Sequence, residues 1–264
     1  MKLNTVYKLS FASFILCIIL ACNALTPASM PTVIPSPIPP TVTSAPLLSQ
    51  QLTVISQALQ ETNQTPPFTI TAQTPQLTGS EDPRVTAFNQ RLNEFVSNEV
   101  DMWRQSFLQN TASTVNKGST LNVTYTLVSQ IGDLWSFKFD SDFYSDGAAH
   151  SGLNSMTLNY DLAQGKELAL ADLFLPNSDY LGAISKYCIT ELSKQPFFDP
   201  TSEQGAQPKP ENYRNWNITP EGLMITFDEY QVAPYAAGPQ QVTVPYSELR
   251  GLINPAGVLG QFVQ

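Results

Sequence analysis

The sequence of 264 residues contains a single histidine, His150. A protein zinc site needs three or four ligands, and the chain without its predicted signal peptide and lipidated cysteine offers one imidazole and one free thiol. Walker and GxGxxG nucleotide-binding loops are also missing from the sequence. A Ser–His–Asp or Cys–His arrangement would need a nucleophile beside His150, and no recognisable motif places one there. We therefore expect no catalytic residue, no metal and no cofactor, and a structural or binding role for His150.

An apolar run covers residues 9–21 and follows two lysines. The run is about as long as the core of a secretory signal and too short to span a bilayer comfortably. It ends in the aliphatic residues Ile19 and Leu20, followed by the small residue Ala21 and then by Cys22, which is the pattern of a lipobox. In a lipobox the small residues admit the signal peptidase, and the cysteine thiol accepts the lipid. We predict a lipoprotein signal peptide over residues 1–21 and lipidation of Cys22. An ordinary signal peptide cut near Ala21 or Ala24, or an uncleaved anchor, remains the alternative.

A proline-rich stretch without charged side chains follows the predicted lipidation site. Residues 23–48 contain seven prolines among threonine, serine and alanine. Such a stretch cannot bury a core and favours an extended tether of about 3.1 Å per residue. We assign residues 22–63 to this tether, and residues 52–59 fit either its tail or a short helix. The predicted location is extracytoplasmic, with a lipid anchor in the cell membrane or, where the organism has one, the outer membrane.

Basic side chains are few. Removing the first 21 residues takes away two of the 13 basic side chains and none of the 22 acidic ones, which leaves a formal net charge of −11. This balance argues against nucleic acid and anionic polymers as partners and is compatible with a cationic partner or with ordinary solubility. With Cys17 in the signal peptide and Cys22 lipidated, Cys188 is the one remaining thiol, and its apolar helical surroundings predict that it is free and buried.

The remaining chain predicts an α+β fold with mainly antiparallel sheets, a long amphipathic helix and a second helix packed on them. Ser80 to Pro83 is a helix start signal, and Ile131 to Asp133 marks a hairpin. The expected strands cover residues 68–75, 121–128, 134–144, 155–162, 217–219, 223–227 and 241–245, and the expected helices cover residues 83–109, 180–192 and 247–253.

Two further stretches hold candidate functional residues. Asp140, Asp142 and Asp146 alternate towards the end of a predicted strand, so a calcium or glycosidase carboxylate pair and a solvated strand face both fit them. Residues 228–238 contain two tyrosines, Tyr230 and Tyr235, interrupted by proline and glycine. Such a loop is typical of a recognition surface or of a structural corner packed on a sheet, and the sequence leaves both interpretations open.

Four motifs appear in a recognisable order, at residues 147–150, 159–174, 227–238 and 244–249. Together they resemble the domain-of-unknown-function family found in the outer part of the anti-sigma-V factor that acts as a lysozyme receptor. The segment before them resembles the companion domain that precedes the catalytic domain of a peptidoglycan deacetylase. The resemblance therefore divides the folded region into residues 64–150 and residues 151–264. Gly147-Ala148 stands where that family has a glycine pair.

The resemblance implies a non-enzymatic binding domain at the cell wall, with a basic protein such as lysozyme, or peptidoglycan, as its partner. We see no sigma-binding or deacetylase segment and carry over neither role. The candidate binding surface consists of Gly147, Ala149, His150, Tyr230, Pro234, Tyr235 and Gly238. The alternatives are a cell-wall hydrolase that uses His150 with Asp146, and a structural spacer lipoprotein of the envelope.

Overall fold

The computed structural model describes residues 48–110, 117–198 and 201–263. The predicted signal peptide, Cys22 and most of the predicted tether lie outside these residues, so their predictions stay predictions. Within the described ranges, no helix is both long enough and apolar enough to cross a membrane. The described residues belong to one compact unit.

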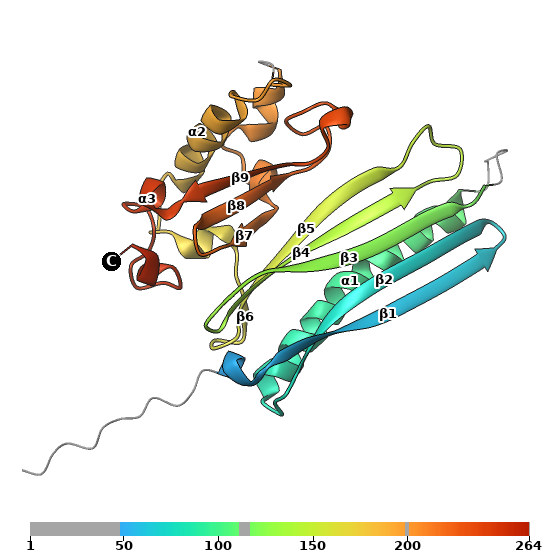
Figure 1. The fold of residues 1–264 in the computed structure, drawn as a ribbon, viewed down its shortest axis with the longest axis horizontal. Coiled ribbons are helices and arrows are strands. Elements are labelled where there is room, and N and C mark those ends of the chain that lie inside the picture. The colour runs from blue at the N-terminus through green and yellow to red at the C-terminus, as the bar shows by residue number, and fades with distance from the viewer. Residues whose placement is uncertain (1–47, 111–116, 199–200, 264) are drawn as a thin grey trace, which may run out of the picture. The chain divides into compact units, whose positions relative to one another are not determined.

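The first part of this unit is a six-stranded sheet whose strands lie side by side in chain order (Figure 1). The strands are β1 (Thr53–Gln64), β2 (Pro67–Thr78), β3 (Ser119–Ile131), β4 (Leu134–Tyr144), β5 (Gly152–Asp161) and β6 (Lys166–Glu167). β2 and β3 pair in parallel, and the other neighbours pair antiparallel. A parallel pair needs a long crossover, which α1 (Pro83–Gln109) supplies.

Helix α1 begins where the sequence predicts and covers one face of this sheet (Figure 1). The Asp82 carboxylate accepts a hydrogen bond from the backbone N–H of Arg84 at 2.8 Å, and Pro83 occupies the first helical position, where its missing N–H costs nothing. The Arg84 guanidinium also bonds this carboxylate and lowers the pKa of Asp82 to about 2. The buried apolar face of the helix comprises Val85, Phe88, Leu92, Val96, Val100 and Phe107.

The strand β1 corrects the predicted tether, which extends to residue 63. Residues 53–63 form neither tether nor helix, because Thr53–Gln64 pairs with β2 along its whole length. β1 lies at the edge of the sheet, and most of its side chains are exposed whichever face they point to. Backbone pairing therefore holds the strand without the alternation of apolar residues that reveals a strand in a sequence.

The second part of the unit is a three-stranded antiparallel sheet with two helices. It contains β7 (Trp216–Ile218), β8 (Gly222–Phe227), β9 (Gln240–Pro245), α2 (Tyr180–Leu192) and α3 (Tyr246–Leu249). Short 3-10 helices occur at Leu48–Gln51, Leu170–Leu173, Ser202–Ala206, Pro210–Tyr213, Tyr235–Ala237 (η5) and Gly260–Phe262. The predicted α+β class is confirmed, as are the expected strands and the two longer helices; the closing helix is shorter than the predicted range 247–253.

The predicted domain boundary after residue 150 falls inside the six-stranded sheet. β5 pairs with β4 from Gly152 opposite Phe143 to Asp161 opposite Leu134, and β6 continues the same sheet. Residues 151–167 therefore belong to the sheet that the prediction gave to the preceding domain. Strand pairing sets this boundary, and a sequence without a flexible linker near residue 150 carries no signal of it.

A buried polar cluster joins the two sheets. The Asn217 amide of β7 donates to the Ser136 hydroxyl at 2.9 Å and to the Phe137 carbonyl at 3.0 Å, both on β4. The Asn159 amide of β5 donates to the Trp216 carbonyl at 2.8 Å. Buried amides must find such partners, so these bonds fix one arrangement of β7 against β4 and β5.

Cys188 lies in α2 with no exposed surface and without a disulfide partner, as predicted. Burial raises the pKa of its thiol to about 12, from an ordinary value of 9.0. Its contribution to stability is therefore full below about pH 9 and is lost as the pH rises towards 12. We expect iodoacetamide at pH 8.5 to leave Cys188 unmodified in the native chain and to alkylate it in urea, as measured by mass spectrometry of the peptide that contains it. Rapid alkylation of the native chain would contradict this burial.

Candidate functional site

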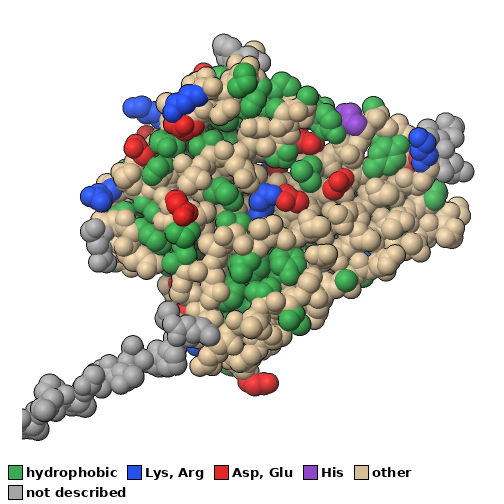
Figure 2. All heavy atoms as spheres, viewed as in Figure 1, with side chains coloured by type: hydrophobic (Ala, Val, Ile, Leu, Met, Phe, Trp, Pro, Cys, Tyr) green, Lys and Arg blue, Asp and Glu red, His purple; other side chains and the backbone are tan. Residues whose placement is uncertain are grey.

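Three aromatic side chains from two distant segments meet at the surface. The ring centroids of His150 and Tyr235 are 4.2 Å apart, and those of Tyr230 and Tyr235 are 5.5 Å apart in a stacked arrangement. His150 follows β4, whereas both tyrosines follow β8, about 80 residues later in the chain. Figure 2 shows the histidine in purple at the surface, with hydrophobic side chains beside it. We call His150, Tyr230 and Tyr235 the aromatic patch.

The hydrogen bonds of His150 indicate the state of its ring. Nδ1 lies 2.7 Å from the Ser151 carbonyl oxygen, which can only accept, so we assign the proton to Nδ1. The Tyr230 hydroxyl lies 3.4 Å from Nε2 and completes the contacts of the ring. His150 therefore bridges the turn that holds it and the exposed Tyr230.

Tyr230 has an unusual backbone and an unusual exposure. Its φ angle is 63°, in the left-handed region that a bulky residue rarely adopts, and 63% of its surface is exposed. A strained residue of this kind persists only where its surroundings determine its conformation. The contacts of the loop around it supply that constraint.

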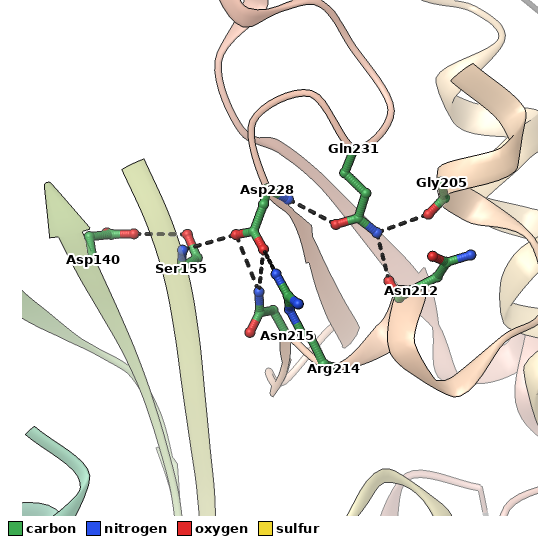
Figure 3. Close-up of polar contacts among 8 residues, drawn as sticks. All are labelled: Asp140, Ser155, Gly205, Asn212, Arg214, Asn215, Asp228 and Gln231. Atoms are coloured by element: carbon green, nitrogen blue, oxygen red, sulfur yellow. Dashed lines mark hydrogen bonds and ion pairs between the residues drawn. The ribbon is translucent and has the colours of Figure 1, made fainter. Parts of the chain in front are cut away.

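Asp228 fixes the start of the loop to the six-stranded sheet (Figure 3). Its carboxylate, 8% exposed, accepts a hydrogen bond from the backbone N–H of Ser155 on β5 at 2.9 Å. The same carboxylate pairs with the Arg214 guanidinium and accepts from the Asn215 amide at 3.3 Å. The Asp228 backbone N–H donates to the side chain of Gln231, whose amide donates in turn to the Gly205 and Asn212 carbonyls.

Two more side chains of the loop bind the same edge of β5. The Glu229 carboxylate accepts from the Leu153 backbone N–H at 3.0 Å, and the Tyr235 hydroxyl donates to the Ser151 carbonyl at 3.0 Å. Residues 151, 153 and 155 alternate, so their backbone groups all point to the edge of β5 that faces away from β4. The loop therefore covers this part of an otherwise open sheet edge with carboxylates and a phenol in place of another strand.

The other predicted site residues lie around the patch. Gly147 has a φ of 89° and is exposed, as is Ala149, and the turn is closed by the Ala148 N–H donating to Ser145 at 2.9 Å. Exposed Pro234 precedes η5 (Tyr235–Ala237), and Gly238 ends it at a φ of 65°. The predicted residues thus come from two segments that contact each other through the aromatic patch; their role in binding stays a prediction.

The three aspartates do not form a metal site. Asp140 pairs with Lys138 and accepts from the Ser155 hydroxyl, Asp142 is exposed, and the Asp146 carboxylate accepts from the Lys117 backbone N–H. Among the described residues, no group of three or more histidine, cysteine, aspartate and glutamate side chains could hold a metal ion.

Sequence reasoning missed the anchoring role of Asp228, Glu229 and Arg214. Asp228 and Glu229 were visible as the charged start of a tyrosine-containing loop, but nothing in the sequence shows that their carboxylates meet β5. The signal that could have pointed to the two carboxylates is their position directly after a strand that ends in apolar side chains. This signal is weak, because two neighbouring acidic residues usually lie on a solvated surface.

Residues 171–247 match the family described as "Protein of unknown function (DUF3298)", so the chain contains a DUF3298 domain. Over 166 residues it is 28% identical to the peptidoglycan-N-acetylmuramic acid deacetylase PdaC of Bacillus subtilis, which covers 62% of this chain and 35% of the deacetylase. Over 111 residues it is 28% identical to the immunogenic protein MPT64 of Mycobacterium tuberculosis, covering 42% of this chain and 49% of that protein. The chain thus spans about a third to a half of these relatives. These matches confirm a domain of unknown function, DUF3298, and a likeness to a peptidoglycan deacetylase; the resemblance to the lysozyme receptor stays a prediction.

Two solved structures share the fold. A DUF3298-family protein of Bacteroides fragilis superimposes with a TM-score of 0.56 at 14% identity, covering 81% of this chain and 97% of that one. A DUF3298-family protein of Pseudomonas aeruginosa superimposes with a TM-score of 0.52 at 17% identity, covering 77% and 95%. Because both cover more than the matched residues 171–247, the shared fold includes part of the six-stranded sheet.

Proposed function

We propose that the chain is an extracytoplasmic binding module of the cell envelope, anchored by lipid at Cys22. It uses the aromatic patch to bind a protein, for example a lysozyme-like muramidase, or a ligand of the cell wall. The observation that carries the proposal is Tyr230, an exposed ring held in a strained conformation by a loop that is bonded to β5. Exposed tyrosines on rigid supports dominate the energy of many binding surfaces.

Three further observations support this proposal. The deacetylase relative carries peptidoglycan in its name, which favours a place at the cell wall for this chain. The resemblance to the outer domain of a lysozyme receptor favours a basic protein as the partner. The formal net charge of −11 without the predicted signal peptide would speed the encounter with such a partner and would make the association sensitive to salt.

A pulldown of lysozyme and of insoluble peptidoglycan with the full-length chain in detergent tests the proposal. We expect saturable binding that weakens at high salt, and a loss of affinity of about tenfold or more in Tyr230→Ala. Leu175→Ala is the matched control, because Leu175 is an exposed apolar residue outside the patch. Binding to neither material, or equal loss in both variants, would argue against the patch as the binding surface.

The proposal includes no catalysis. Both ring nitrogens of His150 are engaged, one by the Ser151 carbonyl and the other by the Tyr230 hydroxyl. We expect muropeptides incubated with the chain to remain unchanged in chromatography. Turnover that disappears in His150→Ala would replace the binding module with the cell-wall hydrolase as the favoured function.

A further inference from the structure

The outer edge of β9 presents backbone groups without strand partners. In the neighbouring strand β8, the Thr226 N–H donates to the Asn215 carbonyl at 2.9 Å, so Thr226 directs its backbone groups towards β7. Successive strand residues face opposite edges, so Ile225 and Phe227 direct theirs towards β9. Val242 and Gln240 lie opposite these two residues. It follows that Gln241 and Thr243 direct their N–H and C=O groups away from β8.

This edge is open within the part of the chain that the structure describes. β9 is the last strand of its sheet, as Figure 1 shows, and the backbone of Gln241 and Thr243 forms no hydrogen bond with a further element there. Both residues are exposed, whereas Val242 between them is buried. The edge thus offers two donors and two acceptors at the spacing of a strand.

A groove runs between this edge and α2. One cavity of about 200 Å³ is lined by four consecutive β9 residues, 240–243, and by Tyr187 and Glu191 of α2. Successive side chains of a strand point to opposite faces, so four in a row line one cavity only if it lies along the strand's edge. A second cavity of about 440 Å³ shares Tyr187 and Glu191 and reaches Glu248 of α3. The two cavities are therefore neighbours along α2, and we call them together the groove.

The groove contains an acidic group without a partner. Burial raises the pKa of Tyr187, and the nearby carboxylates of Glu191 and Glu248 raise it further. Lys194 pairs with Glu191 at 2.6 Å, whereas no other described residue forms an ion pair with Glu248. Lys186 also lines the second cavity, and it forms no ion pair with another described residue either. Glu248 is thus the carboxylate of the groove that no described residue pairs and that a basic ligand can meet.

We propose that the edge of β9 binds an extended peptide segment of another protein as a fourth strand, with a lysine or arginine side chain of that peptide placed at Glu248. Strand addition to an open edge gives affinity through main-chain hydrogen bonds and selectivity through the side-chain groove beside it. The chain's own residues 23–48 do not fit, because they have no basic side chain and their seven prolines lack N–H donors. This site is separate from the aromatic patch and does not rest on the function proposed for it.

A designed peptide tests the proposal on the full-length chain in detergent. The probe is a fluorescein-labelled ten-residue peptide that alternates valine with lysine or threonine, and its affinity is measured by fluorescence anisotropy. We expect binding to weaken by about tenfold when alternate residues of the peptide are N-methylated, since this removes the amides that would face β9. Thr243→Pro should have a similar effect, whereas Thr243→Val, which keeps the backbone N–H, should bind as well as the original chain.

The charge and the location are tested with the same probe. Glu248→Lys should weaken binding of the basic peptide and strengthen that of a peptide with glutamate in place of lysine. Tyr230→Ala should leave the affinity unchanged, which separates this site from the aromatic patch. If circular dichroism shows that Thr243→Pro does not fold, the comparison of the N-methylated with the unmodified peptide still tests the main-chain hydrogen bonds, because it uses the original chain. No binding at about 1 mM peptide, or equal binding of the N-methylated and unmodified peptides, would overturn the proposal.

Discussion

Replacing Phe88 with alanine is expected to lower the free energy of unfolding by about 3–5 kcal/mol. Phe88 of α1 is completely buried and its ring stacks on that of Tyr160 at 4.1 Å. It also meets Trp135 and Phe137 edge-on at 6.4 and 6.1 Å. Truncation would leave a cavity among three large rings that are themselves held by strands β4 and β5, so the surroundings cannot collapse into it. Urea unfolding followed by circular dichroism measures the change.

Met102→Ala provides the matched control in the same helix. Met102 is 52% exposed, so its truncation should change the free energy of unfolding by about 0.5 kcal/mol or less. Equal effects of the two substitutions would mean that α1 does not pack on the sheet through Phe88. A similar m-value for the original chain and both variants is needed for the comparison, since it shows that the same amount of surface is exposed on unfolding.

Replacing Asp228 with alanine is expected to cost about 2–3 kcal/mol and to weaken any ligand that binds the aromatic patch. The substitution removes the carboxylate that accepts the hydrogen bond from the buried Ser155 N–H. A buried donor without a partner carries the full free-energy cost of its lost hydration. The ion pair with Arg214 adds little, because the Arg214 side chain is 65% exposed and its charge is screened by water. Without this anchor, the remaining bonds of Glu229 and Tyr235 to the edge of β5 hold Tyr230 less firmly at its positive φ.

Asp142→Ala is the control for this substitution, because Asp142 is an exposed aspartate of the neighbouring strand β4. It should leave stability within about 0.5 kcal/mol and leave binding unchanged. Asp228→Asn should lie between the two, since it keeps one oxygen to accept from Ser155 but loses the charge that attracts Arg214. If Asp228→Ala is as stable as Asp142→Ala, the loop is not held by its carboxylate.

The sequence was informative wherever one side of an element is buried. The spacing of Val85, Phe88 and Leu92 predicts the covered face of α1, and the capping signal at Asp82 predicts its start. The alternation in the segment that follows Leu134 predicts β4, whose Phe137 and Phe139 are buried on one face. In these elements one face is buried and the other is exposed to solvent. Apolar residues therefore recur in the sequence with the period of the helix or of the strand.

The strand β1 could not be predicted for the opposite reason. Its Ile55 and Leu59 are 48% and 42% exposed, so burial imposes no pattern on them. The parallel pairing of β2 with β3 was missed as well, because the long helix between two strands fits either sheet type. Both features depend on backbone pairing with residues far along the chain, which local patterns do not encode.

The two segments of the aromatic patch could be selected from the sequence, but their contact could not. Gly147 to His150 and the tyrosines at 230 and 235 were chosen for their composition and for a family resemblance. What brings them together is the bonding of Asp228 and Glu229 to Ser155 and Leu153, which requires the edge of β5 to be free at that point. Whether the patch binds a ligand is a question for the pulldown.

The anchoring of the loop to β5 determines which segment of the chain could be grafted into another protein with the aromatic patch preserved. The stretch that matches DUF3298, residues 171–247, contains Asp228 and both tyrosines but neither β5 nor His150. A graft of that stretch into another protein would carry the recognition side chains and leave behind the scaffold that orients them. It would also expose the backbone carbonyl of Trp216 and the side-chain amide of Asn217, whose hydrogen-bond partners lie on β5 and β4. The stretch that the family model matches is therefore smaller than the unit that folds, and we expect only the larger one to keep the patch intact when it is transplanted.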